Sequence, residues 1–372
     1  MFRFVQLHLL TNYPPSNLNR DDTGRPKTAL VGDTTRLRIS SQSQKRAWRT
    51  SDEFYLALGS SASDSTAGAV DWDAKSNPKL GTRTKEAGVR IYKALVGRGV
   101  NEKSAHIWAQ SIAGGFGALK KANKDKPFQD LEIEQLAHFS PEEKAAIDAL
   151  VKVCAERGSA PTEDELKLLS KPQTAVDIAM FGRMLADSPA YNMEAAVQVA
   201  HAITVHKTTV EDDYFSAVDD LNTGLKDKGA GHIGERGYGA GLFYLYVCIN
   251  RELLKDNLGG DDVLTAMALA ALTHAITKVS PTGMQNSHAS RAYASYVLAE
   301  KGDQQPRSLA QAFLKPVKPF DDEDMLDKAV KAIAKRRDNF DKVYGACADA
   351  RYEINVERGE GSLAELITFV QE

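Results

Sequence analysis

Alternating apolar and polar positions predict strands at the start and in the middle of the chain. In residues 1–10, Val5, Leu7 and Leu9 fall on one face. In residues 242–250 (LFYLYVCIN), apolar or aromatic side chains occupy both faces, which is typical of a strand at the centre of a sheet. Shorter strand-like patterns cover residues 36–39, 175–184 and 195–206.

Helical periodicity dominates residues 59–172 and returns toward the C-terminus. A loop rich in Ser, Ala and Gly (59–68) leads into helices expected at 85–96, 102–121, 141–157 and 162–169. Further helices are expected at 262–278, 323–341 and 363–370. Together these patterns predict an α+β protein with a helical insertion.

Two polar stretches interrupt the regular patterns. Residues 11–35 are rich in Asn, Pro, Asp and Gly and read as a long loop. Ser40 or Ser41 then caps a helix that we expect to continue to about Ala57. Residues 207–241, dense in Gly, Asp and Lys, predict a hairpin or a long loop.

Composition places the chain among soluble globular proteins. It has 372 residues, of which 42% are hydrophobic, and neither a signal peptide nor a membrane span is evident. We therefore expect a cytoplasmic protein with no membrane partner. Cys154, Cys248 and Cys347 lie too far apart for a zinc or disulfide framework, so we expect them to be buried small hydrophobes.

Positive charge gathers at the N-terminus although the net charge is −3. Residues 1–50 contain nine Lys or Arg against three acids, so the remaining chain is strongly acidic. A basic segment on an acidic body suits a protein that holds an anion in one groove. A solvated loop explains the charge equally well.

The most informative segment is RLRISSQSQKRAWR, residues 36–49. Arg36 and Arg38 share one face of a strand, and Lys45 and Arg49 share one face of the following helix. The helix start offers free backbone N–H groups and hydroxyls. The segment predicts a binding site for a phosphodiester backbone, with an ordinary capped amphipathic helix as the alternative.

Other motifs are weaker. The sequence GAGHIG (229–234) matches a dinucleotide-binding pattern but precedes a strand instead of following one. Asp21 and Asp22 are more typical of a loop than of a metal site, so we expect no metal and no cofactor. Lys120, Lys121, Lys124 and Lys126 form a basic run that is either solvated or in contact with a second nucleic-acid strand; the candidates for contact with target DNA are Lys120, Lys121 and Lys124.

Several ordered motifs resemble those of CasC-type backbone subunits of Cascade, the type I-E CRISPR surveillance complex. The resemblance begins with NRDD (19–22) and R-x-RISSQS-x-KRA (36–47). It continues through VDIA (176–179), GRM (182–184), AHAIT (200–204) and F-x-AVDDL (215–221). It extends to about residue 260 and is thinner in the helical insertion.

The resemblance implies a right-hand-like architecture. Its parts would be a palm with a modified RRM (ferredoxin-like) fold, a helical fingers insertion and a thumb hairpin. The expected division is palm at 1–58, fingers at 59–170, palm at 171–200, thumb at 201–240, and palm with C-terminal helices at 241–372.

The resemblance also implies a non-catalytic, cytoplasmic protein of antiviral defence. Several copies would form a helical filament along the crRNA, hold its spacer by the sugar-phosphate backbone and present it to target DNA. Expected partners are other copies, the large and small Cascade subunits, the subunit that caps the crRNA 5′ end, the crRNA-processing endonuclease and a recruited helicase-nuclease.

Residue by residue, the resemblance assigns RNA contacts to two groups. The backbone-gripping group is Asn19, Arg20, Arg38, Ser40, Ser41, Gln42, Lys45, Arg46 and Arg49, where Arg49 replaces an expected Lys. The second group is Arg183, Met184 and Phe215, of which Met184 and Phe215 would bracket a displaced base. Core packing is the alternative for these two apolar side chains.

Two rival functions remain open. Related backbone subunits of type III complexes cut target RNA with a loop aspartate, and Asp21 or Asp22 lies in a suitable loop. A stand-alone single-stranded nucleic-acid-binding protein would work as a monomer without partners.

Overall fold

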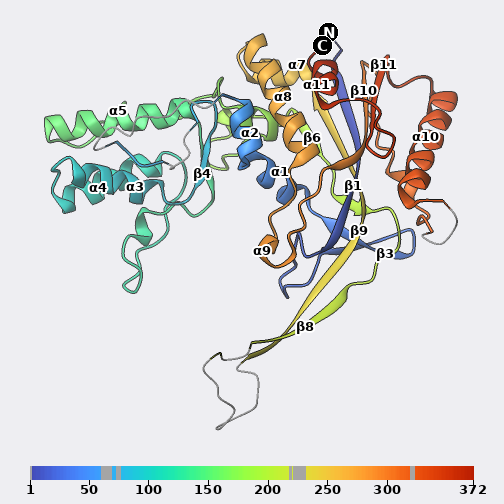
Figure 1. The fold of residues 1–372 in the computed structure, drawn as a ribbon. Coiled ribbons are helices and arrows are strands. Elements are labelled where there is room, and N and C mark those ends of the chain that lie inside the picture. The colour runs from blue at the N-terminus through green and yellow to red at the C-terminus, as the bar shows by residue number, and fades with distance from the viewer. Residues whose placement is uncertain (1, 60–68, 73–76, 218–219, 221–231, 319–322) are drawn as a thin grey trace, which may run out of the picture. The chain divides into compact units, whose positions relative to one another are not determined.

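A computed structural model describes the chain except for residues 1, 60–68, 73–76, 218–219, 221–231 and 319–322 (Figure 1). It is a mixed α and β structure with an antiparallel sheet. The chain divides into two compact units. The first contains Met1–Ala57, Gln198–Ile249 and Leu269–Glu372, and the second contains Leu58–Val197 and Asn250–Ala268.

The first unit is built on a sheet with strand order β11-β10-β1-β9-β7-β3-β2. These strands are β1 (Phe4–Ser16), β2 (Thr28–Val31), β3 (Thr34–Ile39), β7 (Ala202–Thr204), β9 (His232–Asn250), β10 (Ala294–Gly302) and β11 (Ala350–Asn355). The short β6 (Val197–Val199) precedes β7. A further strand, β8 (Glu211–Ala217), pairs with the first part of β9 as a long antiparallel hairpin (Figure 1).

The central strand β1 is buried on both faces. Val5, Leu7 and Leu9 are fully buried, as the alternation predicts, and so are His8 and Leu10 on the opposite face. Burial on both faces means that other parts of the unit cover both faces of the sheet at β1. Leu10 joins an apolar cluster that α10 (Met325–Tyr344) and η3 (Ala310–Phe313) complete.

The other helices of the first unit are α1 (Ser41–Arg49), α2 (Asp52–Ala57), α9 (Gln285–His288) and α11 (Leu363–Gln371). Helix α8 (Asp262–Lys278) begins in the second unit and ends in the first. No helix among the described residues is long and apolar enough to cross a membrane.

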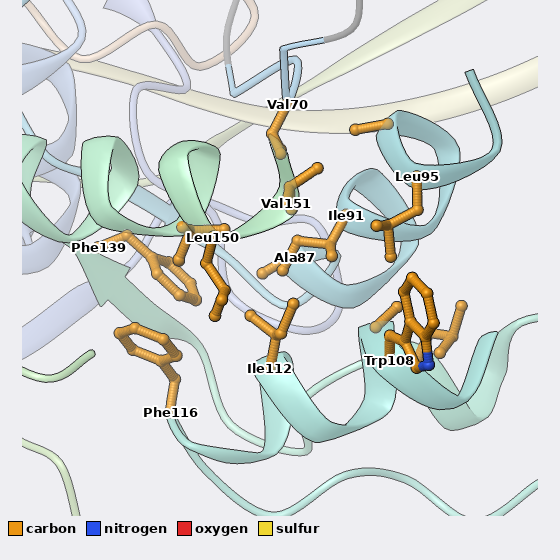
Figure 2. Packing of buried hydrophobic residues seen from close by; sticks show 14 of the residues in the cluster. Val70, Ala87, Ile91, Leu95, Trp108, Ile112, Phe116, Phe139, Leu150 and Val151 are labelled. Atoms are coloured by element: carbon orange, nitrogen blue, oxygen red, sulfur yellow. The ribbon is translucent and has the colours of Figure 1, made fainter. Parts of the chain in front are cut away.

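The second unit is mainly helical. Its elements are α3 (Ala87–Gly97), α4 (Glu102–Gly114), α5 (Pro141–Arg157), α6 (Val176–Phe181), α7 (Arg251–Asn257), η1 (Gln129–Leu131), η2 (Pro189–Tyr191) and the strand pair β4 (Thr82–Thr84) and β5 (Ala137–Phe139). Figure 2 shows its core, where Ile91, Ile112 and Leu150 come from three helices and Phe116 faces Phe139.

The best-defined helix boundary belongs to α5. The Ser140 hydroxyl accepts a hydrogen bond from the Glu143 N–H, and the Glu143 carboxylate accepts one from the Ser140 N–H. Pro141 occupies the first turn, and Gly158 ends the helix at φ 68°. This reciprocal cap and the left-handed glycine explain why the helix begins and ends at the predicted residues 141 and 157.

Several predicted elements are confirmed, and others are wrong. The strand at 242–250, the helix at 262–278 and the hairpin in 207–241 are present, apart from hairpin residues outside the described part of the chain. The strand predicted at 175–184 is wrong, because residues 176–181 form α6. Residues 162–169 form turns, and the predicted long helix from Ser41 ends at Arg49. The three cysteines are buried thiols, as expected.

Candidate nucleic-acid interface

The N-terminus of α1 is fixed by two side chains. The Ser40 hydroxyl accepts a hydrogen bond from the Ser43 N–H, which makes Ser40 the N-cap. The Ser40 N–H in turn donates to the Asn19 side-chain oxygen at 2.8 Å. The first turn of the helix carries no acidic residue, so no side-chain charge there offsets the positive end of the helix dipole.

One side of α1 is buried, and the other side is exposed to solvent. Ala47 and Trp48 are buried and anchor the helix to the first unit. Gln42 and Arg46 are exposed, while Lys45 and Arg49 are half-buried. Burial lowers the pKa of Lys45. The predicted polar residues Gln42, Lys45, Arg46 and Arg49 therefore all keep a solvent-accessible part, whereas Ser40 and Ser41 are buried and contribute mainly to the cap.

The loop before β2 is shaped by Asp21. Its Oδ1 accepts hydrogen bonds from the Thr23 N–H and hydroxyl and from the Arg25 N–H, at 2.8 to 3.0 Å. The Thr23 bond, followed by the backbone donors, lowers the pKa of Asp21. Asp21 therefore holds the loop by hydrogen bonds and leaves Arg20 exposed beside it.

A cleft of about 550 Å³ lies between this loop and α1. Arg20, Ser43 and Arg46 line it, and Thr282 and Gly283 from the segment before α9 contribute another wall. Among the described residues, neither Arg20 nor Arg46 pairs with a carboxylate. Thr282 and Gly283 were missed in the sequence, because a turn-like composition does not point to a binding site. The cleft offers a polyanion two arginines and a serine hydroxyl, and Asp21 and Asp22 of the loop also line it.

Arg36, which was expected beside Arg38 in the phosphate-binding segment, is not available to an anion. Its side chain is fully buried, and its guanidinium donates to the Thr34 hydroxyl and to the backbone carbonyls of Thr204 and Phe313. It therefore holds the sheet edge and cannot grip an external anion. Arg38, two residues on, donates to the Thr28 carbonyl and lies 2.8 Å from Nδ1 of His201.

His201 keeps Arg38 in a defined position. Burial, then the charges of Arg38 and Lys27, lower the pKa of His201. A neutral imidazole can accept the hydrogen bond from the Arg38 guanidinium. Arg38 is half-buried and His201 is exposed, so this pair lies at the surface of the first unit.

Arg183 is also a correction. It is buried in the second unit and makes an ion pair with Glu143 at 2.8 Å. It also donates to the carbonyls of His138, Ser170 and Tyr191. Because its guanidinium is buried and bonded to these acceptors, Arg183 cannot reach a phosphate. The prediction of Arg183 as an RNA contact is therefore wrong.

Met184, in contrast, is 78% exposed. Because the Met184 side chain is unbranched, apolar and exposed to solvent, it is available to pack against a ligand. Core packing, the alternative for Met184, is therefore wrong.

Phe215 lies on β8 of the hairpin and is only partly buried. It pairs with Gly234 across the hairpin, and a Cβ built on Gly234 would come within 2.4 Å of the Phe215 ring. The Arg236 guanidinium lies over the same ring at 4.6 Å. Because Gly234 has no Cβ, the Phe215 ring can pack against its backbone, and the Arg236 guanidinium packs over the ring.

The lysines predicted to contact DNA, in the second unit, differ in whether they pair with a carboxylate among the described residues. Lys120 pairs with Glu132, so its charge is offset. Lys121 and Lys124 are exposed. Lys121 and Lys124 therefore keep their charge available for a nucleic-acid strand.

Comparison with solved structures gave strong matches. One is a chain of a "CRISPR RNA-guided surveillance complex, pre-nicking", with a TM-score of 0.82, 28% identity and coverage of 99% of both chains. Another, a chain of a "CRISPR RNA-guided surveillance complex", has a TM-score of 0.69, 24% identity and coverage of 98% of this chain and 94% of that one. The chain therefore has the fold of a CRISPR surveillance complex subunit.

A comparison with curated proteins gave no match. The family model of the CT1975-like proteins, named Cas_CT1975, matches residues 5–367. Because that match spans nearly the whole chain, the protein belongs to the CT1975-like family.

Proposed function

We propose that this chain is a non-catalytic backbone subunit of a CRISPR surveillance complex that binds crRNA through its sugar-phosphate backbone. The observation that carries the proposal is the open cleft between the Asp21 loop and α1, where Arg20 and Arg46 have no carboxylate partner among the described residues. Phosphate contacts of this kind bind any sequence, which a guide holder requires.

The finer assignment is to a type I-E Cascade. In it, several copies form a helical array along the crRNA spacer and present it to target DNA together with the other Cascade subunits. The sheet of the first unit would serve as the palm, the helices of the second as fingers, and β8–β9 as the thumb. The ordered sequence motifs support this assignment.

The RNA contacts we propose are Asn19, Arg20, Arg38, Gln42, Lys45, Arg46 and Arg49, with the Ser41 backbone at the helix start, since the Ser40 N–H already donates to Asn19. Met184 and Phe215 are the proposed apolar contacts to a displaced base, and Lys121 and Lys124 the proposed contacts to DNA. The exposure of Met184 and the supported ring of Phe215 favour these roles.

An RNA-cleaving subunit is the rival enzyme. The Asp21 carboxylate is engaged by three donors of its own loop, which disfavours it as a metal ligand or a base. Asp22 is exposed and remains the residue to test. If complementary RNA is cleaved in the presence of Mg²⁺, and Asp22→Ala abolishes the cleavage, the rival is correct.

The direct test is copurification of RNA with the full chain, followed by native mass measurement. We expect bound RNA and a multi-subunit assembly. A chain that binds no RNA and joins no assembly would refute the proposal, and an RNA-bound monomer would favour the stand-alone binder.

A further inference from the structure

A second cleft adjoins the first and is also lined by the Asp21 loop. It has a volume of about 450 Å³ and is lined by Arg20, Thr23, Gly24 and Arg25 from the loop, by Glu235 to Gly237 from β9, and by Met284. Volumes of this size are typical of small-ligand pockets. Its cations are Arg20, Arg236 and Arg25, of which Arg25 pairs with Asp212.

The two clefts share their side walls. Arg20 and Gly24 line both of them. The opposite wall comes from consecutive residues, because Thr282 and Gly283 line the first cleft and Met284 lines the second. Two cavities bounded by the same pair of loops form one trough, which runs from α1 to the base of the β8–β9 hairpin.

The wall at residues 282–284 is built closely onto the rest of the unit. A Cβ on Gly283 would meet the carbonyl oxygens of Leu18 and Asn17 at 2.3 and 2.6 Å, so only glycine fits there. Met284 has φ 49°, in the left-handed region that a methionine rarely adopts. Such strain persists where the surroundings impose it, and it is often found at ligand sites.

The loop and the hairpin base are also tied to each other. The Asn17 amide donates to the carbonyls of Gly24 and Gly237 at 3.0 and 2.9 Å. The Arg25–Asp212 ion pair, at 2.8 Å, adds a second link. The second cleft therefore has fixed walls on both the loop and the hairpin.

We propose that the second cleft receives the next nucleotide of the same single-stranded RNA, with Arg236 and Arg20 facing its phosphate and Met284 against its sugar or base. This inference rests on the proposed function, which places RNA in the first cleft. Arg236 has no carboxylate partner among the described residues, and its position over Phe215 connects the trough to the proposed base-displacing ring.

Site-directed crosslinking tests the proposal in the full chain. Because the three natural cysteines are buried, a new surface thiol can be labelled selectively with a photoreactive aryl azide. Thr50→Cys marks the first cleft, Met284→Cys and Arg236→Cys mark the second, and Val356→Cys is the control, since Val356 is 58% exposed and lines neither cleft. The probe is a single-stranded RNA oligonucleotide.

Crosslinks from both clefts, at least several-fold above Val356→Cys, are the expected result. Crosslinks from Thr50→Cys alone, with both second-cleft positions at the control level, would overturn the inference and leave the proposed function standing. No crosslink from any position, with no RNA bound by the natural chain, would overturn both.

Arg236→Gln gives a second measurement. Removing one phosphate contact should lower the log-log salt slope of RNA affinity by roughly 0.7. Arg358→Gln is the matched control, because Arg358 is an exposed arginine whose partner is Asp327. An unchanged slope for Arg236→Gln would contradict the assigned phosphate contact.

Discussion

Two arginine-rich regions of the first unit use the same side chain in opposite ways. In the first cleft, Arg20 and Arg46 are exposed and have no carboxylate partner among the described residues. Around Glu300 of β10, Arg307 and Arg351 both bind one fully buried carboxylate. Arg307 and Arg351 also pair with Asp341 of α10.

The buried network extends to the central strand. His8 lies 3.2 Å from Glu300 and 2.8 Å from the Tyr244 hydroxyl. That hydroxyl accepts from the Leu309 N–H, so it donates to Nδ1 of His8, and Nε2–H of His8 donates to Glu300. In these two regions, the arginines paired with the buried Glu300 carboxylate hold the fold, whereas the exposed arginines that make no such pair in the described part of the chain are available to a ligand.

Removing Glu300 should have the largest effect. Glu300→Gln leaves Arg307 and Arg351 without their shared buried partner, and breaking such a pair costs about 3 kcal/mol or more of unfolding free energy. Urea denaturation followed by circular dichroism measures the loss. Arg358→Gln, which breaks an exposed pair, should cost less than about 1 kcal/mol. Equal losses for the two variants would contradict the comparison.

Reversing charge on α1, at Lys45 and Arg49 beside the residues that line the first cleft, should lower RNA affinity and leave stability nearly unchanged. In the double variant Lys45→Glu and Arg49→Glu, RNA affinity should fall by about 100-fold or more, because repulsion replaces two attractions to phosphate. The unfolding midpoint should change little, since both side chains are only half-buried. Filter binding and thermal unfolding are the measurements. Unchanged RNA affinity would refute the assigned groove.

Acid should destabilise the buried network before it affects the cleft. Burial raises the pKa of Glu300, but hydrogen bonds from His8 and Arg307 outweigh it and hold the pKa well below 4.5. Its stabilisation is therefore present above pH 4.5 and lost as the pH falls below that value. Burial lowers the pKa of His8 below 6.5, so protonation of His8 in the unfolded chain also favours unfolding below pH 6.5.

The measurement is the free energy of unfolding between pH 7 and pH 4. It should decline below about pH 6.5 and more steeply near pH 4.5. Glu300→Gln should remove most of the steeper part. A natural chain with no loss of stability over this interval would contradict the assigned pKa directions.

Local sequence signals predicted the elements whose caps and periodicity are self-contained. The Ser40 cap and the Ser140–Glu143 box are examples, because each is completed within a few residues. The strands β10 and β11 were missed. Strand β10 is buried at every residue but one, and its buried residues include Glu300 and Lys301, so apolar and polar positions do not alternate along it. Its partner β1 is about 290 residues away in the sequence.

Of the candidate side chains that the sequence suggested, only those that are also exposed or half-buried remain available to a ligand. Lys45 and Arg49 were found by their helical spacing and Arg46 by the family resemblance, but Arg36 and Arg183 look the same in sequence and are buried. Their acceptors, the carbonyls of Thr204 and Phe313 and the carboxylate of Glu143, come from distant segments. The Thr282–Met284 wall has no charge, so residue type gave no clue to it.

The smallest predicted effect distinguishes cleft arginines from paired ones one charge at a time. Arg20→Gln removes one cation that lines both clefts, so the log-log salt slope of RNA affinity should fall by roughly 0.7 per lost phosphate contact, or about twice that if Arg20 serves two phosphates. Arg351→Gln, which removes a cation already paired with Glu300 and Asp341, should leave the slope unchanged while lowering stability. Affinities measured between 50 and 200 mM salt give both slopes. A drop of the same size for Arg351→Gln would mean that carboxylate pairing does not decide which arginines bind RNA.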